Sequence, residues 1–159
     1  MTSLFMDTSA LVKRYVRELG SAWVVNLTSD DAGNEITLSQ ITLPETIATF
    51  ANKARAPQGI SQKELARVIA RFLQDCAQRY HLTSVSRELI DSAVILAQRR
   101  ELRGCDAIQL ATALRLNAAL LAAELPPLVF IAADLGLLRA AREERLITEN
   151  PHDHPESKK

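Results

Sequence analysis

Residues 128–134 read LVFIAAD, and this stretch does most to decide the fold class of the chain. Its apolar run follows Pro126-Pro127 and closes at Asp134, as expected of a short strand buried on both faces. From residue 135 to 144 the apolar residues recur with helical spacing. A buried strand that leads directly into a helix predicts one unit of a parallel sheet covered by helices.

The same alternation extends through the rest of the chain. We predict strands at residues 4–6, 35–39 and 128–132, an extended connector at 82–85, and a last edge strand starting at Ile147. Helices are predicted at 9–18, 21–27, 42–56, 61–80, 86–100, 105–125 and 135–144, with capping-box spacing in TLPE (42–45) and SQKE (61–64). The order predicts one α/β domain over residues 1–150: a mainly parallel sheet of four to five strands in a three-layer fold, followed by a polar tail at 151–159.

Composition narrows the class of protein. The chain has 159 residues, and its two cysteines, Cys76 and Cys105, have neither metal-type nor redox-type spacing, which fits a reduced cytosolic protein. The N-terminus lacks the basic and apolar regions of a signal peptide. The most apolar stretch, residues 117–138, contains Glu124, two prolines and Asp134, which excludes a membrane span. We therefore expect a soluble, cytoplasmic protein.

Charge gives a weaker signal. Nineteen basic and 19 acidic side chains leave a net charge of zero, which is a poor signature for a nucleic-acid binder. Basic residues nevertheless stand near acidic ones: Lys13 and Arg14 follow Asp7, and Arg103 precedes Asp106. These residues are either ordinary solvated helix faces or the rim of an acidic site.

Four acids, Asp7, Glu45, Asp106 and Asp134, stand where predicted strands and helices meet. Asp106 shares a helix face with the apolar Leu110, because residues at i and i+4 lie on the same side. An acid aimed at a core is costly, and converging carboxylates repel one another by about 4 kcal/mol per close pair at an effective dielectric near 20. A divalent cation would compensate them, which makes the chain a candidate metal-dependent enzyme.

Each acid also has a purely structural interpretation. Glu45 has the N3 position of a capping box, and Asp134 that of a helix N-cap. Asp106 suits the first turn of a helix, and Asp7 suits an Asx-turn. Position in the sequence does not decide between the two interpretations.

Four stretches resemble the motifs of a known family, the PIN-domain ribonucleases. In order they are residues 5–13 (FMDTSALVK), 43–48 (LPETIA), 104–113 (GCDAIQLATA, the most specific) and 130–138 (FIAADLGLL). The similarity covers residue 4 to about 150, and the chain is most similar to VapC-type toxins of toxin–antitoxin pairs. Two positions depart from the pattern: Ala132 stands where Thr or Ser is frequent, and Gln109 stands where His is common.

The resemblance implies an endoribonuclease that uses Mg²⁺, with Mn²⁺ as an alternative, and leaves a 5′-phosphate and a 3′-hydroxyl. It implies that Asp7 and Asp106 are direct metal ligands, and that Glu45 and Asp134 complete the site or hold metal-bound waters. Thr8 and Ser9 are expected to support these ligands through hydrogen bonds. Lys13, Arg14 and Arg103 are the expected phosphate contacts. The expected partners are RNA and a cognate antitoxin, in a homodimer or a toxin–antitoxin hetero-oligomer, with Trp23 and Phe72 as candidate antitoxin anchors unless they pack in the core.

Two rival classes share part of this pattern. A phosphohydrolase of the haloacid-dehalogenase type also begins with a strand that ends in Asp, but it needs a second Asp two residues on, where this chain has Ser9. The other rival is a non-cleaving PIN-fold module that binds RNA or an antitoxin. Retention of all four acids favours the nuclease.

Overall fold

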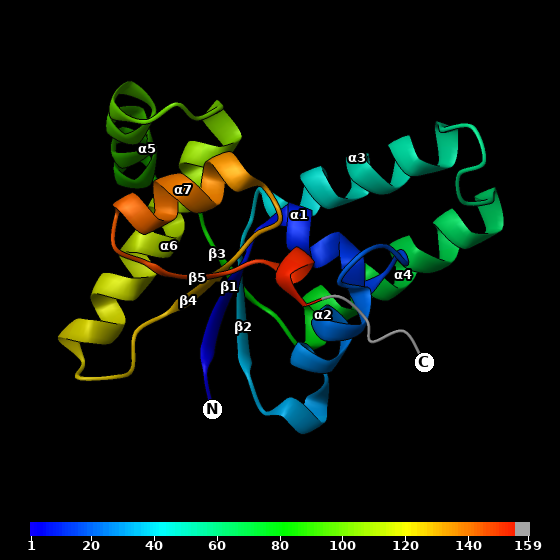
Figure 1. Cartoon of the computed structure of the whole chain (residues 1–159), viewed down its shortest axis with the longest axis horizontal. Coiled ribbons are helices and arrows are strands. Elements are labelled where there is room, and N and C mark those ends of the chain that lie inside the picture. The colour runs from blue at the N-terminus through cyan, green and yellow to red at the C-terminus, as the bar shows by residue number, and fades with distance from the viewer. Residues whose placement is uncertain (155–159) are drawn as a thin grey trace.

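A single parallel sheet forms the centre of the molecule in the computed structural model, which describes residues 1–154 (Figure 1). Its strand order is β3-β2-β1-β4-β5, and every neighbouring pair is parallel. The strands are β1 (Ser3–Met6), β2 (Glu35–Ser39), β3 (His81–Thr83), β4 (Val129–Ile131) and β5 (Ile147–Glu149). The parallel α/β fold predicted from the sequence is confirmed.

Helices cover both faces of this sheet. They are α1 (Thr8–Leu11), α2 (Ser21–Leu27), α3 (Thr42–Arg55), α4 (Gln62–Gln78), α5 (Arg87–Arg99), α6 (Gly104–Ala122) and α7 (Leu135–Glu143), with short 3-10 turns at Val12–Arg14, Asp30–Ala32 and Pro151–Asp153. In Figure 1, α5, α6 and α7 lie on one side of the sheet and α1 to α4 on the other. The molecule thus has the three layers that alternating strands and helices require.

Alternate side chains of the strands enter two separate cores. Phe5 and Phe130 stack at 5.7 Å between ring centroids and pack with residues of α5, α6 and α7. Leu4, Met6 and Leu38 point to the opposite face and pack with residues of α1 to α4. This is the period of two that a strand imposes, with both faces buried because the sheet is parallel.

Strand order brings the carboxyl ends of β1 and β4 side by side. Met6 is in register with Ile131, and the backbone N–H of Asp7 donates to the carbonyl of Ile131 at 2.9 Å. Ligand sites of such sheets lie beyond the carboxyl ends of the strands. Because β1 and β4 pair in parallel, Asp7 and Asp134 lie at the same carboxyl edge of the sheet.

Three local predictions were wrong. The helix expected at residues 9–18 ends early: α1 is followed by a 3-10 turn, and Tyr15 turns inward to donate to Asp75 of α4 at 2.8 Å. Residues 81–83 pair with β2 as a strand of the sheet, where an extended connector was expected at 82–85. At residue 42 no capping box forms, because Thr42 lies inside α3 with its hydroxyl turned to Gln109. In the second predicted capping box the N-cap bond is confirmed, since the Ser61 hydroxyl accepts from the N–H of Glu64, while the Glu64 carboxylate pairs with Arg67.

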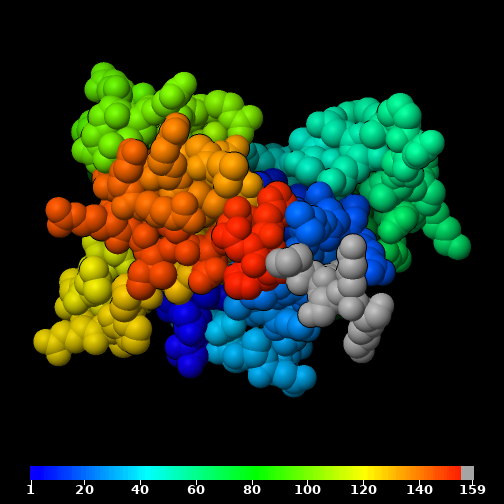
Figure 2. Space-filling model, viewed as in Figure 1, coloured from blue at the N-terminus to red at the C-terminus, as the bar shows by residue number. Residues whose placement is uncertain are grey.

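The end of the described chain packs against α2. The turn at Pro151–Asp153 places Pro151 so close to Gly20 that an added Cβ there would lie 2.4 Å from a carbonyl oxygen. His154 stacks on Trp23 with ring centroids 4.2 Å apart. Figure 2 shows these C-terminal residues, in red, seated between α7 and the blue N-terminal helices. The predicted tail thus begins with packed residues, and its positions 155–159 lie outside the described residues.

Candidate active site

One pocket of about 440 Å³ collects all four acids singled out in the sequence. Asp7 follows β1 directly, Asp134 follows β4, and Glu45 and Asp106 stand in the first turns of α3 and α6. The lining residues are Asp7, Thr8, Ser9, Val12, Glu45, Ala48, Thr49, Arg103, Asp106 and Asp134. Segments separated by more than a hundred residues of sequence thus converge at the carboxyl edge of the sheet.

Asp7 is the buried acid of the set, at 5% exposure. Its carboxylate caps α1 by accepting from the backbone N–H of Ser9 at 2.9 Å, and it also accepts from the Ser9 hydroxyl. Burial raises the pKa of Asp7 to about 6, the Ser9 hydrogen bonds oppose this, and the nearby Glu45 and Asp106 raise it further. The structural role and the site role therefore coexist in one residue.

Ser9 links the two strand ends of the pocket. Its hydroxyl donates to Asp7 and accepts from the backbone N–H of Ala133 at 2.9 Å. This places the segment before Asp134 relative to the carboxylate of Asp7. The family often has a Thr or Ser where this chain has Ala132. The hydroxyl of that residue is not needed here to join the two segments, because the Ser9 hydroxyl contacts both Asp7 and Ala133.

Glu45 is not the partner in a capping box. Its Oε2 accepts from the Thr8 hydroxyl at 3.0 Å and from Nε2 of Gln109 at 2.9 Å. Gln109 is fully buried, and its Nε2 also donates to the Thr42 hydroxyl at 3.0 Å. The sequence showed Gln109 only as a departure from a family pattern. Its contact with Glu45 depends on how α3 and α6 are packed.

Asp106 and Asp134 share a basic neighbour. Arg103 donates through Nε to Asp106 at 3.0 Å, and its terminal nitrogen lies 3.9 Å from Asp134. Asp134 is also the N-cap of α7, accepting from the N–H of Leu137 at 2.8 Å. The Arg103 side chain is 80% exposed, so this contact is formed at the mouth of the pocket, in reach of solvent.

The other two expected phosphate contacts do not line this pocket. Lys13 is buried at 4% exposure and pairs with Glu18 at 3.7 Å. Arg14 donates to the buried Asp75 at 3.2 Å and to the Thr28 hydroxyl at 2.7 Å. Of the three basic residues named from the sequence, Arg103 is the one that the fold brings to the acids.

The carboxylates line the pocket but are not gathered into a ligand cluster. Within residues 1–154, no group of three or more Asp, Glu, His or Cys side chains is arranged so that it could hold a metal ion. The donor chemistry still fits Mg²⁺ or Mn²⁺, because the four acids supply only hard oxygen atoms. In this structure Arg103 is the cationic group in contact with Asp106 and Asp134.

The chain thus combines a three-layer α/β fold with an acidic pocket at the carboxyl edge of its parallel sheet. Residues 4–125 match the family model of the PIN domain, and the chain belongs to the PIN-domain family. A search of curated protein sequences found no match.

Solved structures show the same fold at low identity. VapBC2 from Rickettsia felis bound to a promoter DNA fragment aligns with a TM-score of 0.62 and 15% identity over 94% of this chain and 98% of that chain. PAE2754 from Pyrobaculum aerophilum aligns at 0.59 and 15% identity, over 92% and 89%. A toxin–antitoxin complex from Klebsiella pneumoniae aligns at 0.53 and 17% identity, over 84% and 87%.

Proposed function

We propose that this protein is a metal-dependent endoribonuclease and the toxin of a type II toxin–antitoxin pair. The observation that carries the proposal is the convergence of Asp7, Glu45, Asp106 and Asp134 on one pocket of a PIN domain. Two of the structural neighbours are toxin–antitoxin complexes, which supports this biological setting. As for location, no helix within residues 1–154 is long and apolar enough to cross a membrane, and we propose that the protein acts in the cytoplasm.

In this proposal Asp7 and Asp106 hold Mg²⁺ or Mn²⁺ directly, and Glu45 and Asp134 complete the site. When bound, the cation activates a water for attack on the phosphodiester and offsets charge on the phosphate oxygens. Asp7 is suited to this task because it is buried and already oriented by Ser9, so little conformational freedom is lost when it becomes a ligand. The Thr8 hydroxyl orients the Glu45 carboxylate by donating a hydrogen bond to its Oε2.

Arg103 is the proposed contact for the RNA phosphate. In the structure it pairs with Asp106 and Asp134, and a cation bound by those acids would release it at the mouth of the pocket. A guanidinium at that place matches two phosphate oxygens. Lys13 and Arg14 stay proposed as further contacts, but each would have to give up an ion pair with Glu18 or Asp75. Arg103 is therefore the first of the three to test.

For the antitoxin, we propose a second surface next to α2. Two adjoining pockets of about 410 and 390 Å³ share Arg14, Tyr15 and the exposed Val25. Their further lining residues are Lys13, Arg17, Ser21, Ala22, Asn26, Arg67 and Arg71, and among these described residues none is acidic. A partner segment with acidic and apolar residues would complement this surface, while an Arg or Lys from the same partner would suit the acidic pocket.

The two anchors expected from the sequence do not serve this surface as they stand. Phe72 is fully buried and packs edge-on against Tyr15, so of its two expected roles the structure shows core packing and not an exposed anchor. Trp23 is covered by the ring of His154. Val25, at 42% exposure, is the apolar side chain that α2 offers to a partner.

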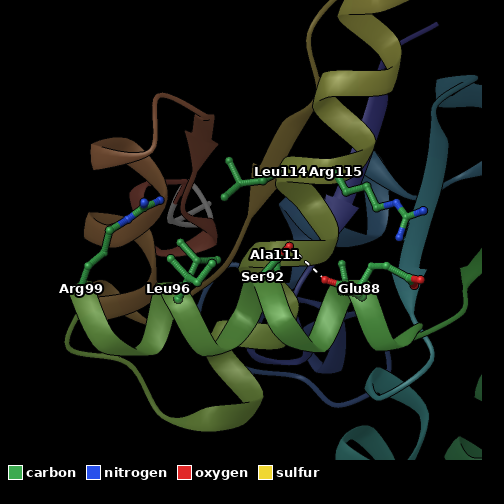
Figure 3. A pocket seen from close by; sticks show the side chains of 9 residues that line it. Glu88, Ser92, Leu96, Arg99, Ala111, Leu114 and Arg115 are labelled. Carbon is green, nitrogen blue, oxygen red and sulfur yellow. Dashed lines mark hydrogen bonds between the residues drawn. The ribbon is translucent and has the colours of Figure 1, made fainter.

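A second copy of the chain is the proposed occupant of the groove between α5 and α6. This groove, about 480 Å³, is lined by Leu89, Leu96 and Leu114 among others. Figure 3 shows Glu88 and Arg115 toward one end and Arg99 toward the other. A two-fold axis through the groove would set its apolar lining against the same residues of the second copy, while Arg99 keeps its ion pair with Glu144 at 2.7 Å within each chain. Ile95 also lines the groove and is 55% exposed, and its neighbour in sequence, Val94, is 51% exposed.

The nuclease proposal is tested with purified protein and a mixture of structured RNAs. We expect cleavage with Mg²⁺ or Mn²⁺, none with EDTA, and none by Asp7→Asn or Asp106→Asn. Asp91→Asn is the matched control, because Asp91 is an exposed acid on α5 paired with Arg87. Metal-dependent cleavage by either site variant at the wild-type rate would refute the assignment. RNA binding without cleavage by the wild type would favour the second candidate, a non-cleaving PIN module. The observation in favour of this candidate is that residues 1–154 contain no preformed group of three or more metal-ligating side chains.

A further inference from the structure

Gln109 is a buried polar residue next to the acidic pocket that the assigned roles do not use. It is completely buried on α6, one turn beyond Asp106 on the same helix. Its amide donates to Oε2 of Glu45 at 2.9 Å and to the Thr42 hydroxyl at 3.0 Å. Both N–H groups of this amide donate to residues of α3. An apolar residue of the same size could fill the core without the cost of desolvating an amide, so packing alone does not explain a glutamine at this position.

The contact holds Glu45 through one oxygen. The Thr8 hydroxyl and the Gln109 amide both donate to Oε2, at 3.0 and 2.9 Å, so neither occupies Oε1. Since an ionised carboxylate only accepts hydrogen bonds, the Gln109 amide must present its NH₂ group to Glu45. Burial and the neighbouring Glu45 raise the pKa of the Cys105 thiol, which is exposed. Gln109 is the donor to Glu45 that solvent does not reach.

The donor is also neutral, and this matters next to a cation site. A Lys or Arg at this place would cancel the charge of Glu45 and compete with a metal ion, whereas an amide orients the carboxylate and leaves its charge intact. Because Gln109 and Asp106 are on the same face of α6, the amide also couples the position of Glu45 on α3 to that of Asp106. The two acids are thereby held at a set separation.

We infer that Gln109 is a positioning residue of the acidic site: it orients the Glu45 carboxylate of α3 from α6 for cation binding. The inference rests on the proposed function, which it deepens. Gln109 acts through Glu45, and no contact between Gln109 and the substrate is proposed. Loss of a hydrogen-bonding partner of a metal ligand typically lowers metal affinity or activity by about 10- to 100-fold.

The test uses Gln109→Met, which keeps an unbranched side chain of similar length and removes both donors. The readouts are Mn²⁺ affinity of the purified protein by calorimetry, cleavage rate, and melting temperature. We expect Mn²⁺ affinity to fall by about 10- to 100-fold. Gln109→His, whose ring N–H can donate, should recover most of it. The matched control is Thr112→Val, because Thr112 is equally buried on α6 but bonds only within its own helix, to Ile108. Thr112→Val should keep wild-type affinity.

A double-mutant cycle separates positioning from a general effect on packing. In a Glu45→Ala background, Gln109→Met should change Mn²⁺ affinity by less than about twofold, because the group through which Gln109 acts is gone. An equal loss in both backgrounds, or wild-type affinity in folded Gln109→Met, would overturn the inference. If Gln109→Met does not fold, Gln109→Asn takes its place, since its amide is one methylene too short to reach Glu45. Mn²⁺ binding without RNA cleavage by the wild type would refute the proposed nuclease function and leave this inference standing.

Discussion

Asp7→Asn should make the metal-free protein more stable while it removes activity. Asp7 is 5% exposed, and its pKa is raised from an ordinary value of 3.8 to about 6, first by burial and then by Glu45 and Asp106. A rise of that size corresponds to about 3 kcal/mol of lost stability once the group is ionised. Asparagine keeps an oxygen that can accept from Ser9, so the N-cap of α1 survives.

The sign follows from the raised pKa. Protonated Asp7 contributes its full stability below pH 4, and this is lost as pH rises through about 6, whereas the asparagine side chain of the variant does not titrate. The stability of the variant relative to the wild type should therefore increase between pH 4 and 7, by up to about 3 kcal/mol, or roughly 6–12 °C in melting temperature for a domain of this size.

The measurement is chemical denaturation in EDTA at several pH values, with Asp91→Asn as the exposed-acid control. Added Mg²⁺ should then stabilise the wild type and not the Asp7→Asn variant, because only the wild type keeps the full set of ligands. A difference in unfolding free energy that is the same at pH 4 and pH 8 would refute the reasoning, and so would a variant less stable than the wild type at every pH.

Three further perturbations test other parts of the structure. Arg103→Gln should tighten Mn²⁺ binding in calorimetry, because Asp106 and Asp134 lose a competing cation. The same variant should reduce the slope of RNA affinity against salt concentration by about one unit, and an unchanged slope would place the RNA elsewhere. Gly20→Ala should destabilise the protein by more than about 1 kcal/mol in urea denaturation, since Gly20 has a φ of 84° and faces the Pro151 carbonyl; a neutral effect would show that the C-terminal turn is not packed as described. Ile95→Glu should convert the proposed dimer to a monomer in sedimentation, and a variant that stays dimeric would exclude the groove between α5 and α6.

Local patterns were enough to predict most of the fold. The apolar run at residues 128–132 and the alternation of strands with helical periodicity led to the parallel sheet, and α2 and β2 begin and end at the predicted residues. These features depend on side-chain period and on capping, which act over a few residues. The four acids could be picked out for the same reason, because each stands at the boundary of an element.

The tertiary structure decided how those acids are surrounded. Gln109 reaches Glu45 across 64 residues of sequence, and Arg14 is taken up by Asp75 across 61, so neither contact leaves a local signature. The early end of the first helix has the same cause, since the inward turn of Tyr15 is stabilised by partners on and just after α4. Short-range periodicity placed the acids on elements, while strand order and helix packing determined which charges became neighbours, because electrostatic and hydrogen-bond energies depend on distance in space and not along the chain.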